Sequence, residues 1–498
     1  MSETSIFSIL LDSTHAEAFM KLIGRAKERQ QLQEAIEKDE SQLIAVYGRR
    51  RVGKTYLIEN SLSKEIVFDA IGINGANLRT QLNNFKTQIV KRSKRFNKSP
   101  DPQNWFDAFQ LLQEYIETKN KGKKVIYIDE FPWFCGQRSE FLPVFEHFWN
   151  NFCAKRNDII IVVCGSAASF MVNNVINNKD GLHGRISLTI RLMPFNLHET
   201  NQYLKYKKIN WDNYDIVQCY MTLGGIPHYL NQLDKRYTLP QNIDRLCFTE
   251  GGQLTNEFDQ VLLSLFRNSS LHKSIIIELA KKKKGLTRKE LNKNLRKGDN
   301  KTFTRSITEL EESGFITEGP AFDQKTRKNL FRLNDEFCFF YLKYIKPNKG
   351  QGEGTWLQLF SSRSFDSWSG FAFEMTCMKH TPQIKKALGI PKVRTTTHSW
   401  TSKATQKGHK KHGAQIDMLL KRQDRRIDII EMKFYNKPYT ISKSYREKLI
   451  NKKNIFEEEI KPSEALALIM ITTNGLKKNI HSNILTDHLT MEVLFEKD

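Results

Sequence analysis

The apolar segment Leu43-Ile44-Ala45-Val46-Tyr47 runs directly into Gly48-Arg49-Arg50-Arg51-Val52-Gly53-Lys54-Thr55. The second segment fits G-x-x-x-x-G-K-[ST] at every fixed position, and it lies between a predicted strand and a predicted helix over residues 56–61. Glycines allow backbone N–H groups to close around phosphates, and the positive end of the helix dipole faces the same place. The stretch therefore predicts a phosphate-binding loop that includes Gly48, Arg51 and Gly53. In it, Lys54 would reach the β- and γ-phosphates and Thr55 would ligate Mg²⁺.

A second element of such a site follows 75 residues after Lys54, where Val125-Ile126-Tyr127-Ile128 leads into Asp129-Glu130. Four apolar residues followed by two acids are typical of a buried strand that ends at the top of a sheet. We expect Asp129 to hold Mg²⁺ through water and Glu130 to polarise the attacking water.

The spacing of the apolar runs predicts the fold class. Runs at residues 43–47, 66–69, 125–128 and 159–164 alternate with stretches of helical periodicity, beginning with residues 21–40. This alternation is typical of an α/β fold with a parallel sheet and crossover helices. Residues 194–266 have a helical pattern that is broken at Gly224-Gly225-Ile226-Pro227.

The N-terminal half resembles prokaryotic ATPases of the AAA+/STAND group, in particular the branch described mainly from archaea. The matching segments are Ile23-Gly24-Arg25-Ala26-Lys27-Glu28, the Tyr47–Thr55 loop, Ile128-Asp129-Glu130, Cys164-Gly165-Ser166, Gly184-Arg185 and Gly225-Ile226-Pro227. The resemblance implies ATP as the ligand, with Ile23 and Arg25 near the adenine and Ser166 as a sensor at the end of its strand. It also implies that Pro227 is a lid residue and that Arg185 senses the γ-phosphate; a surface arginine paired with an acid is the alternative for Arg185.

Residues 267–345 form a basic segment with 18 Lys and Arg against 10 Asp and Glu. Helices predicted over residues 274–283, 288–295 and 302–313, followed by a hairpin over 315–332, resemble a winged helix, with Ile307, Leu310 and Ile316 packing inward. DNA contact would fall to a set of polar and basic residues: Lys301, Thr304, Arg305, Lys325, Arg327 and Lys328. A rigid adaptor without DNA contact is the alternative.

Two carboxylates near the C-terminus suggest a second site. Asp417 lies in the apolar stretch 416–420, and Glu431 and Lys433 lie in the stretch 427–433. Residues two apart on a strand share a face, and the 14-residue separation allows Asp417 to sit beside Glu431 in an antiparallel pair. Two converging carboxylates repel unless a cation is present, so we expect Mg²⁺ or Mn²⁺ between them and a lysine that acts on water or phosphate.

This D…E-x-K arrangement resembles the PD-(D/E)XK nuclease superfamily over residues 355–498. The resemblance places Glu374, in Trp368-Ser369-Gly370-Phe371-Ala372-Phe373-Glu374, at the position of the helical acid. The domain has 25 Lys and Arg against 15 Asp and Glu, as binding to a phosphate backbone requires. His409 and His412, in the loop 407–412, are expected to face phosphate or solvent.

The whole chain of 498 residues has 78 Lys and Arg against 55 Asp and Glu, a net charge of +23 that favours nucleic acid as a partner. A hydrophobic content of 39% excludes a wholly disordered chain, and no uncharged apolar run reaches the roughly 18 residues of a bilayer span. Seven cysteines without a C-x-x-C pair favour a reduced, cytoplasmic protein with no membrane association.

The expected organisation is an N-terminal extension (1–20), a P-loop ATPase core (21–195), a helical lid (196–266), a winged helix (267–345), a linker (346–354) and a nuclease-like α/β domain (355–498). The expected function is an ATPase whose nucleotide state controls DNA binding and metal-dependent cleavage. An ATP-dependent DNA-binding scaffold with an inactive nuclease-like domain is the alternative, and a chaperone-like switch without nucleic acid is a third. Homo-oligomerisation stays open.

Overall fold

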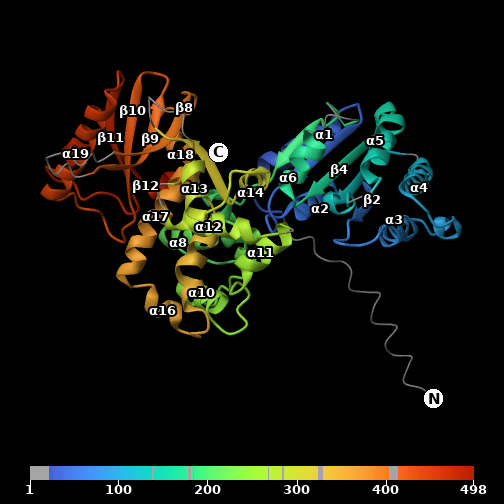
Figure 1. Ribbon diagram of the computed structural model, residues 1–498, viewed down its shortest axis with the longest axis horizontal. Helices are drawn as coiled ribbons and strands as arrows, with labels where there is room; N and C mark the ends of the chain where they lie inside the picture. Colours follow the sequence, from blue (N-terminus) through green and yellow to red (C-terminus); the bar gives the residue numbers. More distant parts are fainter. Residues whose placement is uncertain are drawn as a thin grey trace, which may run out of the picture. The chain divides into compact units, whose positions relative to one another are not determined.

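The computed structural model describes residues 22–497 apart from 120, 137–138, 178–180, 183, 267, 283–284, 323–328 and 403–412 (Figure 1). The expected N-terminal extension, the hairpin residues Lys325, Arg327 and Lys328, and the loop with His409 and His412 lie outside the described residues. The described chain divides into two compact units. The first contains the residues before Val46, those of Lys54–Cys164 and those of Lys179–Ile190, and the second contains the rest.

A five-stranded parallel sheet has the strand order β2-β3-β4-β1-β5. Its strands are β1 (Gln42–Tyr47), β2 (Ile66–Ile71), β3 (Lys124–Asp129), β4 (Ile159–Gly165) and β5 (Leu188–Arg191). Every residue of β1, β3 and β4 is buried, as continuous apolar runs require when helices cover both faces of a sheet. The first four strands are confirmed; the short β5, with two exposed polar residues out of four, was missed because it lacks an apolar run.

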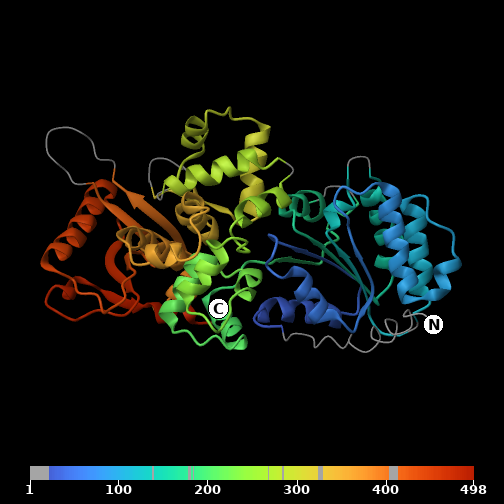
Figure 2. The ribbon, with the colours of Figure 1, turned by 90° about the horizontal axis from the view of Figure 1, so that it is seen from below.

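Helices pack around this sheet (Figures 1 and 2). They are α1 (Ala26–Glu37), α2 (Lys54–Leu62), α3 (Leu78–Arg92), α4 (Trp105–Glu117), α5 (Phe141–Asn151) and the single turn α6 (Ala168–Phe170), which continues as a π-helix (Met171–Ile176). The side chains of Asn77 and Asn104 cap α3 and α4. Trp105, Phe109 and Phe141 form an aromatic core between α4 and α5, with ring centroids 4.7–6.3 Å apart.

A helical region follows, as the sequence predicts. It comprises α7 (Leu197–Tyr206), α8 (Asn213–Leu223), α9 (Pro227–Asn231), α10 (Leu239–Cys247) and α11 (Glu257–Leu265). The predicted break is confirmed, because Gly224 and Gly225 have φ angles of 70° and 64° between α8 and α9. A Cβ on Gly225 would lie 2.2 Å from the carbonyl oxygen of Phe195, so only glycine fits there.

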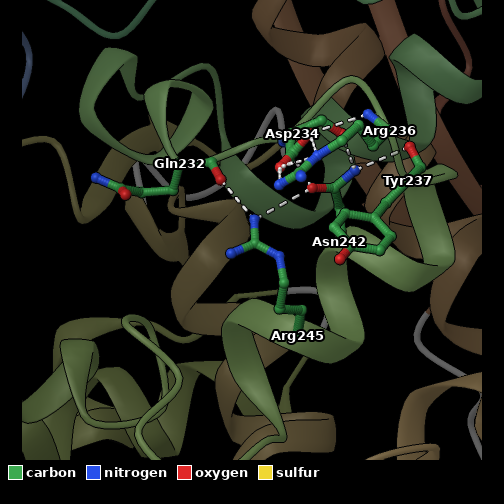
Figure 3. A network of polar contacts seen from close by, with 6 residues as sticks. All are labelled: Gln232, Asp234, Arg236, Tyr237, Asn242 and Arg245. Atoms are coloured by element: carbon green, nitrogen blue, oxygen red, sulfur yellow. Dashed lines mark hydrogen bonds and ion pairs between the residues drawn. The ribbon is translucent and has the colours of Figure 1, made fainter.

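The loop between α9 and α10 is held by one buried amide (Figure 3). Asn242 Nδ2 donates to the carbonyl oxygens of Asp234, Tyr237 and Thr238 at 2.9–3.2 Å, and its Oδ1 accepts from the Asp234 N–H. Beside it, the Arg245 guanidinium donates to the Gln232 carbonyl at 2.7 Å. One side chain thus satisfies four main-chain groups of a loop that contains no regular secondary structure.

The next elements confirm the predicted helices and hairpin. Helices α12 (Ser270–Lys281), α13 (Arg288–Leu295) and α14 (Lys301–Glu312) precede the antiparallel strands β6 (Ile316–Pro320) and β7 (Asn329–Leu333). The residues expected to pack inward, Ile307, Leu310 and Ile316, are at most 4% exposed. Helix α15 (Glu336–Phe340) and a π-helical turn (Tyr341–Ile345) come next, and the expected linker is anchored where the Gly354 N–H donates to Asp244 on α10 at 2.7 Å.

The C-terminal part contains a mixed sheet with the strand order β12-β11-β10-β9-β8 (Figure 1). Its strands are β8 (Thr395–Thr401), β9 (Gln415–Arg422), β10 (Arg426–Lys433), β11 (Ala465–Thr472) and β12 (Asp487–Thr490). Strands β8, β9 and β10 pair antiparallel, whereas β10, β11 and β12 pair parallel. Helices α16 (Thr355–Leu359), α17 (Arg363–Lys379) and α18 (Thr381–Ala387) precede the sheet, and α19 (Lys443–Ile460) packs on it.

Across the described part of the chain, no helix is both long and apolar enough to cross a membrane.

We predict that Asn242→Ala destabilises the protein by about 2–3 kcal/mol, because four hydrogen bonds between this buried side chain and the loop are lost at once. Gln232→Ala is the matched control, because Gln232 contributes only its main-chain oxygen to this network. Urea unfolding followed by circular dichroism measures both. Equal stability of the two variants would contradict a structural role for the Asn242 amide.

Candidate functional site

The first site forms where β1 and β3 end. Lys54 is the first residue of α2 and is 7% exposed. The next residue, Thr55, donates from its hydroxyl to Asp129 Oδ2 at 2.7 Å. Asp129 is the last residue of β3, so the carboxyl edge of the parallel sheet places it beside the start of α2. The hydroxyl and carboxylate that the sequence assigns to one Mg²⁺ therefore lie in direct contact.

Glu130 follows Asp129 in a strained backbone conformation. Its φ is 45°, in the left-handed region that costs a residue with a side chain roughly 1 kcal/mol or more, and its N–H donates to Asp129 Oδ1 at 2.8 Å. Glu130 is half-buried. Tyr127, two residues earlier, was not predicted from the sequence to lie beside this site. Burial raises the pKa of its hydroxyl, and Cys164 and Asp129 raise it by smaller amounts. The sequence did contain a signal for this position: Tyr127 lies two residues before Asp129 on one strand, so both side chains point to the same face of the sheet.

The loop before Lys54 needs its two glycines for different reasons. A Cβ on Gly48 would lie 2.3 Å from the carbonyl oxygen of Leu192, whose N–H donates to the Tyr47 carbonyl at 2.7 Å. Gly53 has a φ of 89° and nothing within 4 Å of a built Cβ, so the space beside it is open. A positive φ with open space at Gly53 is what a loop that closes its backbone around phosphates needs.

Two arginines of the loop are held by distant carboxylates that the sequence did not reveal. Arg49 forms an ion pair with Asp335, and Arg51 forms one with Glu257. The main chain of Arg51 also contacts α9, because its carbonyl accepts from the N–H of His228 at 3.5 Å. Pro227, the residue expected in a lid, is the first residue of that helix.

The remaining predicted nucleotide residues are placed as follows. Ser166 is 3% exposed and comes directly after β4. Arg25 is 4% exposed, with a φ of 58° just before α1, and Ile23 is half-buried. Arg185 is exposed, and its N–H donates to the Leu182 carbonyl.

The second site lies on β9 and β10. Ile430 and Met418 form the pair at the end of their ladder, so Glu431 and Asp417 come directly after it on neighbouring strands. Glu431 accepts from Lys433 Nζ at 3.0 Å, from the Tyr445 hydroxyl at 2.7 Å and from Lys452 Nζ at 2.6 Å. Tyr445 and Lys452 were missed, although their seven-residue spacing places both on one face of α19.

The electrostatics of the two carboxylates differ. Burial and then the charge of Glu431 raise the pKa of Asp417 to about 6, and Lys452 and Lys433 reverse only part of this. Burial would also raise the pKa of Glu431, but Lys433, Lys452 and Tyr445 outweigh it, so its pKa is lowered. Glu431 therefore ionises more readily than a free glutamate, and Asp417 ionises less readily than a free aspartate. This is expected for two adjacent acids whose charges are only partly neutralised.

Glu374 and Asp417 line one cavity, together with Arg332 from β7 and Ser399 from β8. The Arg332 guanidinium donates to Ser399 Oγ at 2.7 Å. Phe322, next to the hairpin strand β6, packs into the core of this sheet, 5.3 Å from the ring of Phe456. Within the ranges that the structure describes, no three His, Cys, Asp or Glu side chains are grouped to hold a metal.

The residues expected to contact DNA on α14 lie on its surface. Lys301, Thr304 and Arg305 are exposed. Thr304 accepts from the Arg288 guanidinium at 2.5 Å, and Arg305 lies 3.7 Å from Glu309.

Comparison with known proteins identifies a family for the first part of the chain. Residues 22–233 match the family described as the ATPase domain predominantly from Archaea. An uncharacterised protein of Methanocaldococcus jannaschii is 23% identical over 431 residues, which are 85% of this chain and 90% of that protein.

Solved structures show more distant similarity. A Walker-type ATPase of Pyrococcus abyssi has a TM-score of 0.46 and 17% identity, covering 64% of this chain and 96% of that one. The ORC2 protein of Aeropyrum pernix has a TM-score of 0.40 and 14% identity, covering 69% and 96%. A STAND protein of Pyrococcus horikoshii with a tetratricopeptide repeat sensor has a TM-score of 0.30 and 14% identity, covering 74% and 52%.

The family match and the geometry of the loop agree. The match over residues 22–233 and the contact between Thr55 and Asp129 both point to ATP as the ligand of the loop before Lys54.

We predict that Lys54→Ala weakens ATP binding at least about tenfold, because the phosphates lose a buried positive charge. Glu130→Gln should keep ATP affinity and lower kcat by about 10²-fold, because Asp129 still holds Thr55. Calorimetric titration with ATP and a phosphate-release assay measure the two quantities. Loss of affinity in both variants would contradict the separate roles.

We also predict that Asp417→Asn stabilises the protein at pH 7.5 by up to about 3 kcal/mol, because the pKa of Asp417 is raised to about 6. A folded-state pKa above the unfolded value means that ionisation opposes folding. The stability gain should therefore vanish near pH 4, grow as the pH rises towards 6 and stay constant above it. Asp428→Asn is the control, because this buried acid is paired with Arg426 and its loss should destabilise the protein at pH 7.5. Thermal unfolding across this pH range is the measurement.

Proposed function

We propose that this protein is an ATPase that couples its nucleotide state to DNA binding and to divalent-metal-dependent phosphodiester cleavage by a PD-(D/E)XK-like C-terminal domain. The proposal keeps the division into an ATPase core (21–195), a lid (196–266), a winged helix (267–345), a linker (346–354) and a nuclease-like domain (355–498).

The contact between Thr55 and Asp129 supports ATP hydrolysis at the first site. ATP would lie along the loop 48–53 with its terminal phosphates at Lys54. Thr55 and Asp129 would hold Mg²⁺, which would neutralise the charge of the phosphates. Glu130 would orient the attacking water, and Ser166, Arg185 and Pro227 would complete the pocket with Ile23 and Arg25.

The placement of Asp417, Glu431 and Lys433 carries the nuclease assignment. Two carboxylates on neighbouring strands supply the hard oxygen donors that Mg²⁺ or Mn²⁺ prefers, and the pKa of Asp417 is raised by burial and then by repulsion from Glu431, both of which a bound cation would offset. Such an ion would lower the pKa of a bound water and polarise the scissile phosphate. Lys433 would stabilise charge developing on that phosphate, and Glu374, across the same cavity from Asp417, would orient water.

Charge supports DNA as the substrate. Residues 267–345 carry a net charge of +8, and residues 355–498 carry +10. Positive surfaces of this kind bind the phosphate backbone in a salt-dependent manner. The exposed Lys301 and Arg305 on α14 are available for such contacts.

A short stretch of chain supports coupling between the two sites. Arg332 lines the cavity of Glu374 and Asp417, and three residues later Asp335 binds Arg49 of the phosphate-binding loop. A change in the loop on ATP binding or hydrolysis would therefore be transmitted to the cavity through four residues of the backbone.

An ATP-dependent DNA-binding scaffold without cleavage is the second candidate. The observation that favours it is the set of donors on Glu431, because Lys433, Lys452 and Tyr445 already occupy the oxygens that a metal would use. In that case the lysines replace the cation, and the site binds phosphate without cutting it.

The test is incubation of the full chain with duplex DNA and Mg²⁺ or Mn²⁺, with and without ATP. We predict metal-dependent cleavage that is lost in Glu431→Ala and reduced about 10²-fold in Lys433→Ala, while both variants still bind DNA. Glu464→Ala is the matched control, because it removes an acid of the same sheet that pairs with Lys421 away from this pair. Salt-dependent DNA binding without cleavage in the wild-type protein would instead establish the scaffold.

A further inference from the structure

The variable positions of the phosphate-binding loop carry three consecutive arginines, and two of them are ion-paired inside the protein. The pattern of the loop fixes only its glycines, Lys54 and Thr55, so it assigns no function to Arg49 or Arg51. Both of their partners, Asp335 and Glu257, lie beyond the residues that match the ATPase family.

The pair between Arg49 and Asp335 is almost completely removed from water, with each side chain 4% exposed. The guanidinium of Arg49 also lies 4.6 Å from the ring centroid of Phe315. Asp335 is held in turn, because its carboxylate accepts from the N–H of Cys338 at 2.6 Å and caps the start of α15. The planar guanidinium of Arg49 is thus paired with a carboxylate that is itself held at the start of α15. The loop therefore has little conformational freedom at Arg49.

Burial would lower the pKa of Arg49, but Asp335 and smaller contributions from Tyr229 and Cys338 reverse this and raise it. Burial would likewise raise the pKa of Asp335, and Arg49 reverses it so that the pKa falls. Each group therefore stabilises the charged form of the other. Removing one leaves a buried, unpaired charge that the loop would have to move to solvate.

The second pair acts on the other side of the loop. Glu257 is fully buried, and it also accepts from the hydroxyl of Tyr229 at 2.8 Å. Its partner Arg51 has a φ of 73°, a left-handed conformation that an arginine adopts only when its surroundings impose it. The same conformation turns the backbone into the curve that presents N–H groups to phosphate.

We infer that Asp335 and Glu257 are positioning residues for ATP: they hold Arg49 and Arg51 so that the loop is shaped to bind phosphates before ATP arrives. The inference rests on ATP binding at this loop. It adds that the binding site depends on a residue of α11 and on the residue that precedes α15, both of which lie outside the loop. Pre-organisation of this kind lowers the cost of binding.

The test uses Asp335→Asn and Glu257→Gln in the full chain, with ATP as the probe in calorimetry and in steady-state hydrolysis. Each variant should raise the Kd and the KM for ATP by about tenfold while kcat changes much less, because the loop contacts the phosphates both before and during reaction. A variant that is merely destabilised loses folded molecules, which lowers kcat and leaves KM unchanged. The ratio of the two effects therefore separates positioning from general damage.

Glu336→Gln is the matched control. Glu336 is adjacent to Asp335 and 2% exposed, but its partner is Lys379 at 2.6 Å and not the loop. It should leave the KM for ATP unchanged. In addition, Arg49→Ala combined with Asp335→Ala should be no worse than Asp335→Ala alone, because both remove the same interaction.

Wild-type KM values in folded Asp335→Asn and Glu257→Gln would overturn the inference, as would an equal rise of KM in Glu336→Gln. If Asp335→Asn does not fold, Glu257→Gln decides the outcome, because it acts through Arg51 and retains a hydrogen-bond acceptor for Tyr229. Failure of the wild-type protein to bind ATP would refute the proposed function itself, which is a different result.

Discussion

The contact between the Thr55 hydroxyl and the Asp129 carboxylate is the interaction on which the first site depends. It joins the start of α2 to the end of β3, and the site has a fixed shape only if both ends are fixed. Burial fixes them, because every residue of β1 and β3 is buried and the strands cannot slide without exposing an apolar face. The strain at Glu130, with its φ of 45°, persists because this framework is rigid.

A second constraint acts throughout the larger unit: it buries many carboxylates, and nearly every one that shapes a site is matched by a cation. Asp335 has Arg49, Glu257 has Arg51, and Glu431 has Lys433 and Lys452. Asp417 differs, because burial and its neighbour Glu431 raise its pKa and the lysines do not compensate fully. Burial also leaves the pKa of Glu257 raised in spite of Arg51, so what sets the C-terminal pair apart is the second carboxylate, Glu431, which is the reason for the cation in our proposal.

The sequence was informative where the chemistry is local. The glycines, Lys54 and Thr55 lie within eight residues of one another, and Asp129 is recognisable as an acid at the end of an apolar run. The residues that sequence reasoning missed reach their sites from a distance. Asp335 is 286 positions from Arg49, and Tyr445 and Lys452 come from a helix that follows the strands they complete. An ion pair between residues so far apart leaves no periodicity in the sequence, so only the folded chain brings it into view.

The position of Asp335 in the chain links these constraints. It comes two residues after a hairpin strand whose Arg332 contacts Ser399 of the C-terminal sheet, and it immediately precedes α15, where Glu336 binds Lys379 of α17. The phosphate-binding loop is thus tied to a segment that is anchored on both sides to the C-terminal part. If Arg49 moved when the bound phosphates were hydrolysed or exchanged, Asp335 would either move with it or lose its ion-pair partner while still buried. A buried carboxylate without an ion-pair partner has a high free energy, so movement of Asp335 together with Arg49 is the more favourable response. The displacement would then reach Arg332 and the carboxylates that share its cavity. The connection from Arg49 through Asp335 to Arg332 would thus transmit a displacement mainly because the ion pair is buried, and less because its two charges attract each other.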